Sequence, residues 1–125
     1  MFHEIFLACV KDPGGIVSVA SVSPEDKPHI ANTWNKYLIL TDDEKILIPC
    51  FGFRHTETNI AAQDDVEVII GSDKVQGKMG MGTGFLLTGK AEFQKEGVLF
   101  ERMHEKCSFA NRVLVFSPVS CRQTI

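Results

Sequence analysis

The stretch Ile16-Val17-Ser18-Val19-Ala20-Ser21-Val22 is followed by Ser23-Pro24-Glu25-Asp26-Lys27-Pro28 and then by His29-Ile30-Ala31-Asn32-Thr33-Trp34. The first run is β-branched and apolar, which predicts a strand. The second run carries two prolines and predicts a turn. The third opens an extended segment that continues to Leu40. The stretch therefore predicts two strands joined by a short turn.

The flanking sequence continues this alternation of strands and turns. Further strands are predicted over Lys45–Phe53, Val66–Ser72, Phe85–Phe93 and Arg112–Cys121, and short helices over Phe2–Val10, Thr56–Gln63 and Val98–Cys107. A cluster of four glycines between Gly77 and Gly84 predicts a flexible loop. Six strands joined mostly by turns, with three short helices, predict a mainly β fold built as a six-stranded antiparallel barrel.

Length and charge limit the classes of protein that fit. At 125 residues the chain is shorter than an average domain of about 150 residues, so one domain over residues 1–125 is predicted. A nucleic-acid binder usually has a basic excess, whereas this chain has a net charge of −3, so no nucleic-acid partner is expected. No apolar run is long enough to span a membrane and no secretory signal opens the chain, which predicts a cytoplasmic protein without a membrane partner.

Cysteines and histidines are too scattered to predict a metal site. The four cysteines, Cys9, Cys50, Cys107 and Cys121, form no CxxC pair. We therefore expect reduced and mostly buried thiols. The four histidines have no metal-ligand spacing, and no metal is predicted.

Polar residues interrupt the extended segment after His29. Asn32-Thr33-Trp34-Asn35 carries two asparagines, which strands disfavour, together with the chain's one tryptophan. A buried amide must find hydrogen-bond partners, and amphipathic aromatic residues suit a planar ligand. The segment is either a polar platform for a ligand or a strand end with solvated asparagines.

A second candidate segment lies where a strand is followed by a helix. It comprises Pro49-Cys50-Phe51-Gly52 and, after Phe53, Arg54-His55-Thr56, with Thr56 expected to cap the helix. The free N–H groups of a helix N-terminus attract phosphate, and an arginine adds a charge-assisted contact. A solvated basic turn is the alternative.

Three runs of residues resemble a known family. The run Ala31-Asn32-Thr33-Trp34-Asn35-Lys36-Tyr37-Leu38, the run Gly82-Thr83-Gly84-Phe85-Leu86 and the ending Gln123-Thr124-Ile125 resemble the FMN-binding split-barrel family related to pyridoxamine 5′-phosphate oxidase, in particular members from sulfate-reducing bacteria. The resemblance runs nearly end to end. It implies a six-stranded antiparallel Greek-key split barrel and a homodimer that binds FMN non-covalently near the subunit interface.

The resemblance also implies roles for the candidate residues. Those implied to line the flavin and its ribityl-phosphate chain are Asn32, Thr33, Trp34 and Asn35, and those implied to lie along the isoalloxazine ring are Pro49, Cys50, Phe51 and Gly52. His55 and Thr56 are implied to hold the phosphate. Phe109 and Ile125 are implied to approach the flavin from the partner subunit.

This chain departs from the family at several of these positions. Related proteins have lysine where this chain has His55, so phosphate binding is expected either to move to the neighbouring Arg54 or to become pH-dependent. Phe51-Gly52 replaces a pair of glycines and narrows the space beside the ring. Phe109 replaces a tryptophan and Ile125 a leucine, which keeps an apolar cover of different shape.

Three functions agree with these residues. The first is a small electron-transfer flavoprotein that passes electrons to a redox partner protein. The second is a flavin-dependent oxidoreductase of the pyridoxamine 5′-phosphate oxidase or flavin reductase type. The third is a binding module that holds another ligand, such as haem. The short chain leaves little room for a substrate-binding extension, which favours the first; no catalytic residue is predicted.

Overall fold

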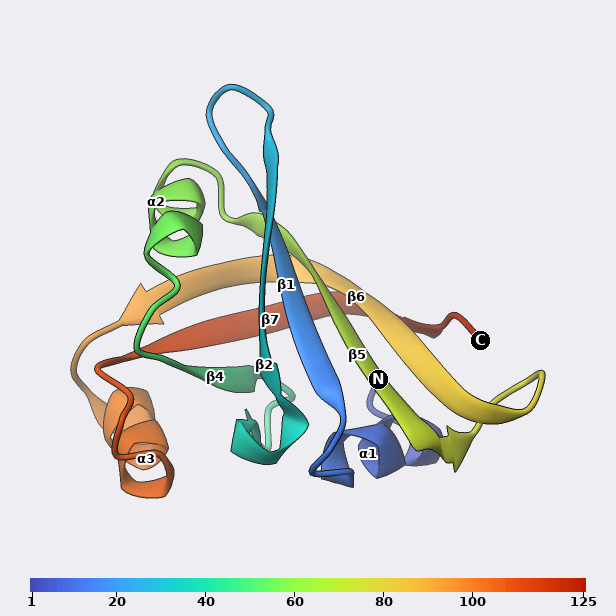
Figure 1. The fold of residues 1–125 in the computed structure, drawn as a ribbon. Helices are drawn as coiled ribbons and strands as arrows, with labels where there is room; N and C mark the ends of the chain where they lie inside the picture. Colours follow the sequence, from blue (N-terminus) through green and yellow to red (C-terminus); the bar gives the residue numbers. More distant parts are fainter.

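The computed structural model describes residues 1–125 and shows one curved sheet with three helices at its margins (Figure 1). The helices are α1 (Glu4–Lys11), α2 (Arg54–Ala62) and α3 (Val98–Lys106), and a 3-10 turn, η1, covers Asn35–Tyr37. The strands are β1 (Ile16–Val22), β2 (Pro28–Trp34), β3 (Ile39–Leu40), β4 (Ile46–Cys50), β5 (Asp65–Gln76), β6 (Met81–Gln94) and β7 (Arg112–Gln123).

All neighbouring strands pair antiparallel, in the order β2-β1-β5-β6-β7-β4-β3. The predicted mainly β antiparallel fold is confirmed, and so is the strand–turn–strand unit over β1 and β2. The long central strands β5, β6 and β7 curve, and α1 and α2 lie at opposite ends of the sheet (Figure 1). None of the helices has the length and apolar character needed to cross a bilayer.

The sheet has seven strands where the sequence predicts six, because the segment from His29 to Leu40 is not continuous. It breaks at η1, where Asn35 is buried and its side-chain amide donates to the carbonyl oxygens of Cys9 at 3.0 Å and Gly71 at 3.3 Å. A Cβ on Gly15 would overlap this amide and the Gly71 carbonyl. The turn therefore forms because Asn35 bonds to buried backbone, which leaves only the short β3 beyond it.

The loop predicted over Gly77–Gly84 is shorter in the structure. β5 continues to Gln76 and β6 begins at Met81, so residues 77–80 alone connect the two strands. Gly82 has φ of 105° and Gly80 of 158°, and Gly82 therefore adopts a backbone conformation that favours glycine within the strand. The glycines allow a tight hairpin, in which Gly82 and Gly84 belong to β6.

The core lies on the concave side of the sheet. Burial alternates along β1 and β5, as expected for strands with one buried face. A cluster of 17 buried residues fills the barrel, and a second cluster of six packs beneath α3 against β4 and β7. Cys9, Cys50 and Cys107 are buried and all four thiols are free, as predicted.

Candidate functional site

The junction of β4 and α2 combines a buried strand end with an exposed turn. All five residues of β4 are buried, whereas Phe51, which follows, is 67% exposed. Phe53 adopts a left-handed conformation with φ of 60° immediately before α2, and no side chain caps the helix. α2 begins at Arg54, two residues before the predicted start, so Thr56 lies within the first turn and is not the cap. The uncapped first turn presents free N–H groups and the positive end of the helix dipole.

The three predicted phosphate-binding residues occupy this first turn in different environments. The Arg54 side chain is 67% exposed and its Nη1 lies 3.7 Å from Oε1 of Glu57. His55 is exposed, and its ring stacks on that of His29 from β2 with centroids 4.3 Å apart. Thr56 is buried, and its hydroxyl has no hydrogen-bond partner. The turn thus offers two exposed basic side chains beside an unsatisfied hydroxyl.

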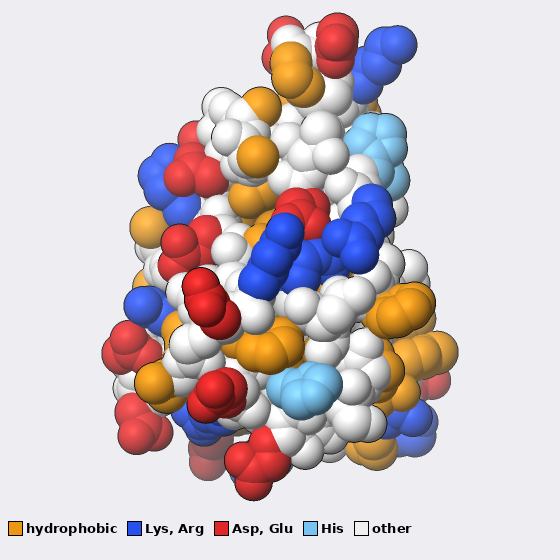
Figure 2. All heavy atoms as spheres, turned by 90° about the vertical axis from the view of Figure 1, so that its left-hand side faces the viewer, with side chains coloured by type: hydrophobic (Ala, Val, Ile, Leu, Met, Phe, Trp, Pro, Cys, Tyr) orange, Lys and Arg blue, Asp and Glu red, His pale blue; other side chains and the backbone are white.

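A buried arginine lies behind this turn. Arg112, at the start of β7, donates from Nε to Oε1 of Glu57 at 2.8 Å and from Nη2 to the Gly52 carbonyl. Its Nη1 donates to Oδ1 of Asn111 at 3.3 Å. Figure 2 shows basic side chains gathered around an acidic one on the side of the molecule that carries α2 and α3. Sequence reasoning missed Arg112 because strand contacts bring it here from 55 positions beyond Glu57.

The four residues predicted to form one platform, Asn32 to Asn35, point in different directions in the structure. Asn32 pairs with Ser18 and Trp34 with Ile16 on β1, and both side chains lie on the exposed outer face of the sheet. Thr33 points to the opposite face, which it shares with His29 because strand side chains alternate. Asn35 lies in η1 with its amide already bonded.

Two of the residues predicted along the ring are buried. Pro49 pairs with Val113, and Cys50 with Arg112, within the sheet. Burial raises the pKa of the Cys50 thiol to about 12, although the nearby Arg112 charge acts in the opposite direction. The thiol therefore stays protonated at neutral pH and acts as a packing group, while the Phe51-Gly52 turn remains open to solvent.

Phe109 and Ile125 make contacts with η1 and β6, respectively, within one chain. The ring of Phe109, in the loop after α3, packs edge-on against Tyr37 with centroids 5.2 Å apart and remains half exposed. The Ile125 carbonyl accepts a hydrogen bond from the Thr83 hydroxyl at 2.8 Å, and its side chain is also half exposed. The C-terminus lies on the far side of the molecule from α2 (Figure 1). Within one chain Ile125 is therefore distant from α2, and the Phe109 ring packs on Tyr37 of η1.

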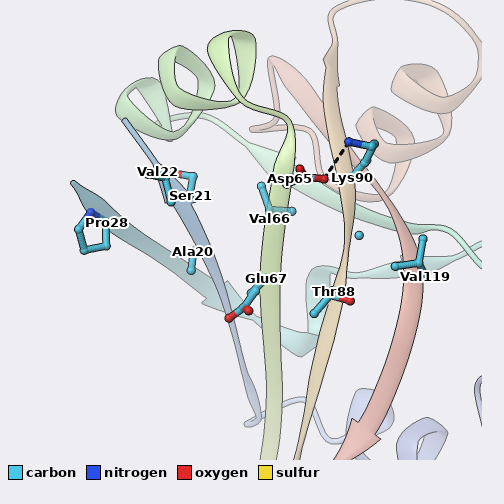
Figure 3. A pocket seen from close by; sticks show the side chains of 11 residues that line it. Ala20, Ser21, Val22, Pro28, Asp65, Val66, Glu67, Thr88, Lys90 and Val119 are labelled. Atoms are coloured by element: carbon cyan, nitrogen blue, oxygen red, sulfur yellow. Dashed lines mark hydrogen bonds and ion pairs between the residues drawn. The ribbon is translucent and has the colours of Figure 1, made fainter. Parts of the chain in front are cut away.

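Another hollow lies elsewhere on the molecule. It has a volume of about 630 Å³ and opens on the outer face of β1, β5 and β6. Figure 3 shows Ala20, Val66 and Val119 around it, with Asp65 and Lys90 paired at its margin at 2.8 Å. It holds no nucleophile or base in a catalytic arrangement, and no group of three metal-ligating side chains is found in the structure.

Comparison with known proteins places this arrangement in a family. The family model described as pyridoxamine 5′-phosphate oxidase matches residues 7–124. The chain belongs to the pyridoxamine 5′-phosphate oxidase family. A protein of Nitratidesulfovibrio vulgaris strain Miyazaki F named FMN-binding protein is 41% identical over 125 residues, which is 100% of both chains. This confirms the resemblance drawn from the Asn32–Tyr37 segment.

Solved structures share the fold. A HupZ variant from Group A Streptococcus superposes with a TM-score of 0.80 at 17% identity, covering 99% of this chain and 100% of that one. An FMN-binding protein from Syntrophomonas wolfei gives a TM-score of 0.70 at 17% identity, covering 87% of this chain and 76% of that one. At such identities the likeness establishes the architecture alone.

Proposed function

We propose that this chain binds FMN non-covalently and serves as a small electron-transfer flavoprotein. The observation that carries the proposal is the uncapped first turn of α2, where Arg54 and His55 are exposed and the Thr56 hydroxyl is buried without a partner. Such a turn suits a phosphate, because free N–H groups, the helix dipole and a guanidinium all favour a negative charge. The 41% identity to a protein named FMN-binding protein supports a phosphorylated flavin as the ligand.

Residues of this end, together with the outer face of β2, would contact such a ligand. Arg54, His55 and the first-turn N–H groups would hold the phosphate. Phe51 is 67% exposed and offers apolar contact to a planar ring. Thr33 lies on the same face of β2 as His29 and would supply a polar contact there. Asn32 and Trp34, which is 46% exposed, lie on the opposite, outer face of β2, so their contact with a ligand would be made across the dimer interface proposed below. When bound, FMN supplies the redox chemistry, while the protein supplies binding and orientation.

Three of the predicted contact residues are better explained as supports. Asn35 holds η1 in place through its two carbonyl partners, so we assign it a positioning role. Pro49 and Cys50 are buried in β4 and set the point from which the Phe51-Gly52 turn leaves the sheet. Their contribution to the ligand is the placement of that turn.

A second copy of the chain would complete the site. Ile16, Ile30, Trp34 and Ile69 are exposed on the outer face of three adjacent strands. A group of large apolar side chains on one face is typical of an interaction surface. We propose that this face pairs with another copy as a homodimer and brings Phe109 and Ile125 of that copy toward the ligand. Residues 1–125 act as one domain in this arrangement.

The alternative is a flavin-dependent oxidoreductase, which the description of the matching family favours. The first measurement is an absorbance spectrum of the purified protein and an FMN titration followed by flavin fluorescence. Saturable binding of FMN supports the proposal, and failure to bind added FMN overturns it. Assays with pyridoxamine 5′-phosphate and with NAD(P)H then distinguish the two roles. A carrier gives no rate above that of free FMN, whereas a saturable rate shows an enzyme.

A further inference from the structure

Arg112 is unusual because it carries a charge at a fully buried position. The residue is 1% exposed, and charged side chains are seldom buried unless they are paired. Its guanidinium contacts Glu57 and Gly52 by hydrogen bonds, and the guanidinium carbon lies 5.3 Å from the ring centroid of Phe93. One side chain of β7 therefore joins α2, the turn after β4 and strand β6.

The turn that Arg112 holds has few other attachments. Phe53 is in a left-handed conformation, and α2 has no side-chain cap. On the other side of the turn, the Asn111 N–H donates to the Cys50 carbonyl at 3.0 Å. The bond from Arg112 to the Gly52 carbonyl fixes the peptide between these points. The direction in which the first turn of α2 faces thus depends on Arg112.

Arg112 also pairs with Glu57, which carries the one carboxylate in the first turn of α2. Oε1 of Glu57 lies 2.8 Å from Nε of Arg112 and 3.7 Å from Nη1 of Arg54. An unpaired carboxylate here would repel a phosphate and would hold Arg54 to itself. Because the buried arginine is the nearer partner, the exposed Arg54 side chain is free to turn toward a ligand.

We propose that Arg112 is a positioning residue for phosphate recognition. It fixes the Phe51–Phe53 turn and neutralises Glu57, which leaves Arg54 and the first-turn N–H groups of α2 available to a phosphate monoester. The inference rests on the proposed function for the identity of that ligand. The inference goes beyond the proposed function because it assigns a part in phosphate recognition to Arg112, which does not contact the phosphate.

The test compares Arg112→Met, Glu57→Gln and the double variant by titration with FMN and with riboflavin. We expect Arg112→Met to weaken FMN binding by about tenfold and riboflavin binding by about threefold or less. The reason is that Glu57, once it has lost Arg112, repels the phosphate of FMN, and riboflavin has no phosphate. Adding Glu57→Gln to Arg112→Met should recover about threefold of the FMN affinity. Equal losses for both ligands, or no recovery in the double variant, would overturn the proposal.

Two further variants separate positioning from loss of fold. Arg112→Lys keeps the charge and should keep the preference for FMN over riboflavin. Ile70→Ala removes a buried side chain in β5 and is the control for lost stability. It should lower the free energy of unfolding and leave the preference for FMN over riboflavin unchanged. If Arg112→Lys loses the preference as fully as Arg112→Met, or Ile70→Ala loses it too, the assignment is wrong.

Hydrogen exchange tests the same role without any flavin. The Glu57 amide donates to the Phe53 carbonyl at 2.9 Å and closes the first turn of α2. We expect this amide to exchange about tenfold faster in Arg112→Met than in Ile70→Ala at equal global stability. Unchanged exchange would refute the positioning role. If the wild-type protein fails to bind FMN, the proposed function fails while this measurement still decides the role of Arg112.

Discussion

The two ends of the barrel differ in how their polar groups are paired and in the charges that lie beside them. At the α1 end, the Asp12 carboxylate accepts hydrogen bonds from the Gly14 N–H at 3.0 Å and the Ser72 hydroxyl at 2.6 Å. The Asn35 Nδ2 donates to two buried carbonyls at the same end, and only its Oδ1 has no partner. At the α2 end, the Thr56 hydroxyl has no partner, and the basic side chains of Arg54 and His55 are exposed beside it.

This difference indicates which end stabilises the fold and which end is the candidate site. Buried polar groups that bond to one another stabilise the fold, because leaving them unpaired is costly. Polar groups that lack partners, next to exposed basic side chains, are typical of a place that a ligand completes. The α1 end is therefore a structural closure of the barrel, and the α2 end is the candidate site.

The largest effect is expected from Asn35→Ala, which breaks the closure at the α1 end. The Cys9 and Gly71 carbonyls would lose their partner while remaining buried. We expect the free energy of unfolding to fall by about 3 kcal/mol, measured by urea denaturation. Asn32→Ala, at an exposed position of β2, is the matched control and should change it by about 0.5 kcal/mol or less. Equal losses in the two variants would show that the amide bonds of Asn35 do not close the barrel.

The next effect concerns the ligand at the α2 end. Arg54→Ala should weaken FMN binding by about tenfold, which corresponds to about 1.4 kcal/mol, and should leave riboflavin binding nearly unchanged. Isothermal titration calorimetry with both ligands measures the difference. Arg102→Ala, which removes an exposed arginine from α3, should leave both affinities unchanged. If FMN and riboflavin lose affinity equally in Arg54→Ala, then Arg54 does not contact the phosphate.

A smaller effect is expected from His55, whose ring stacks on that of His29. A ring N–H of His55 can donate to a phosphate, whereas riboflavin has no phosphate to accept it. His55→Ala should therefore weaken FMN binding a few-fold and leave riboflavin binding nearly unchanged, as measured by calorimetry at a single pH. His29→Phe keeps a ring stacked on His55 and should change neither affinity. Equal losses for both ligands in His55→Ala would exclude a contact between His55 and the phosphate.

The smallest effect is expected in the acid range at the α1 end. Hydrogen bonds from Ser72 and then from the Gly14 N–H lower the pKa of Asp12 below its usual range. A lowered pKa in the folded state contributes stability above the unfolded pKa, and that contribution is lost as the pH falls through the folded value. The urea midpoint of wild type should approach that of Asp12→Asn as the pH falls below about 4. The exposed Asp42→Asn is the control, and a constant gap between wild type and Asp12→Asn would contradict the prediction.

Much of the fold could be predicted because local patterns agree with it. The β-branched run of β1 and the two prolines of the following turn define their elements without help from the rest of the chain. The segment after His29 could not be predicted as two strands, because the partners of Asn35 come from α1 and β5. The loop at the glycine cluster was predicted too long because glycine favours loops, and only pairing with β5 shows that Gly82 and Gly84 lie in a strand.

The candidate site could be predicted in part. Arg54, His55 and Thr56 follow a buried strand directly, so their place at a helix start is a local property. His29 and Arg112 are distant in sequence from that turn, and nothing in their own neighbourhood predicts the stack or the buried ion pair. Phe109 and Ile125 remain predictions that need a second copy of the chain.

The sequence by itself determined the class of the fold, the order of its main strands along the chain and the position of the basic residues between a buried strand and a helix. These follow from periodicity, turn residues and local charge, which act over a few positions. Only the tertiary structure decided that Asn35 supports the barrel, that Cys50 is a packing thiol and that Arg112 lies behind the candidate site. Each of those roles depends on hydrogen bonds or burial between segments that the sheet brings together, and such contacts have no local signature.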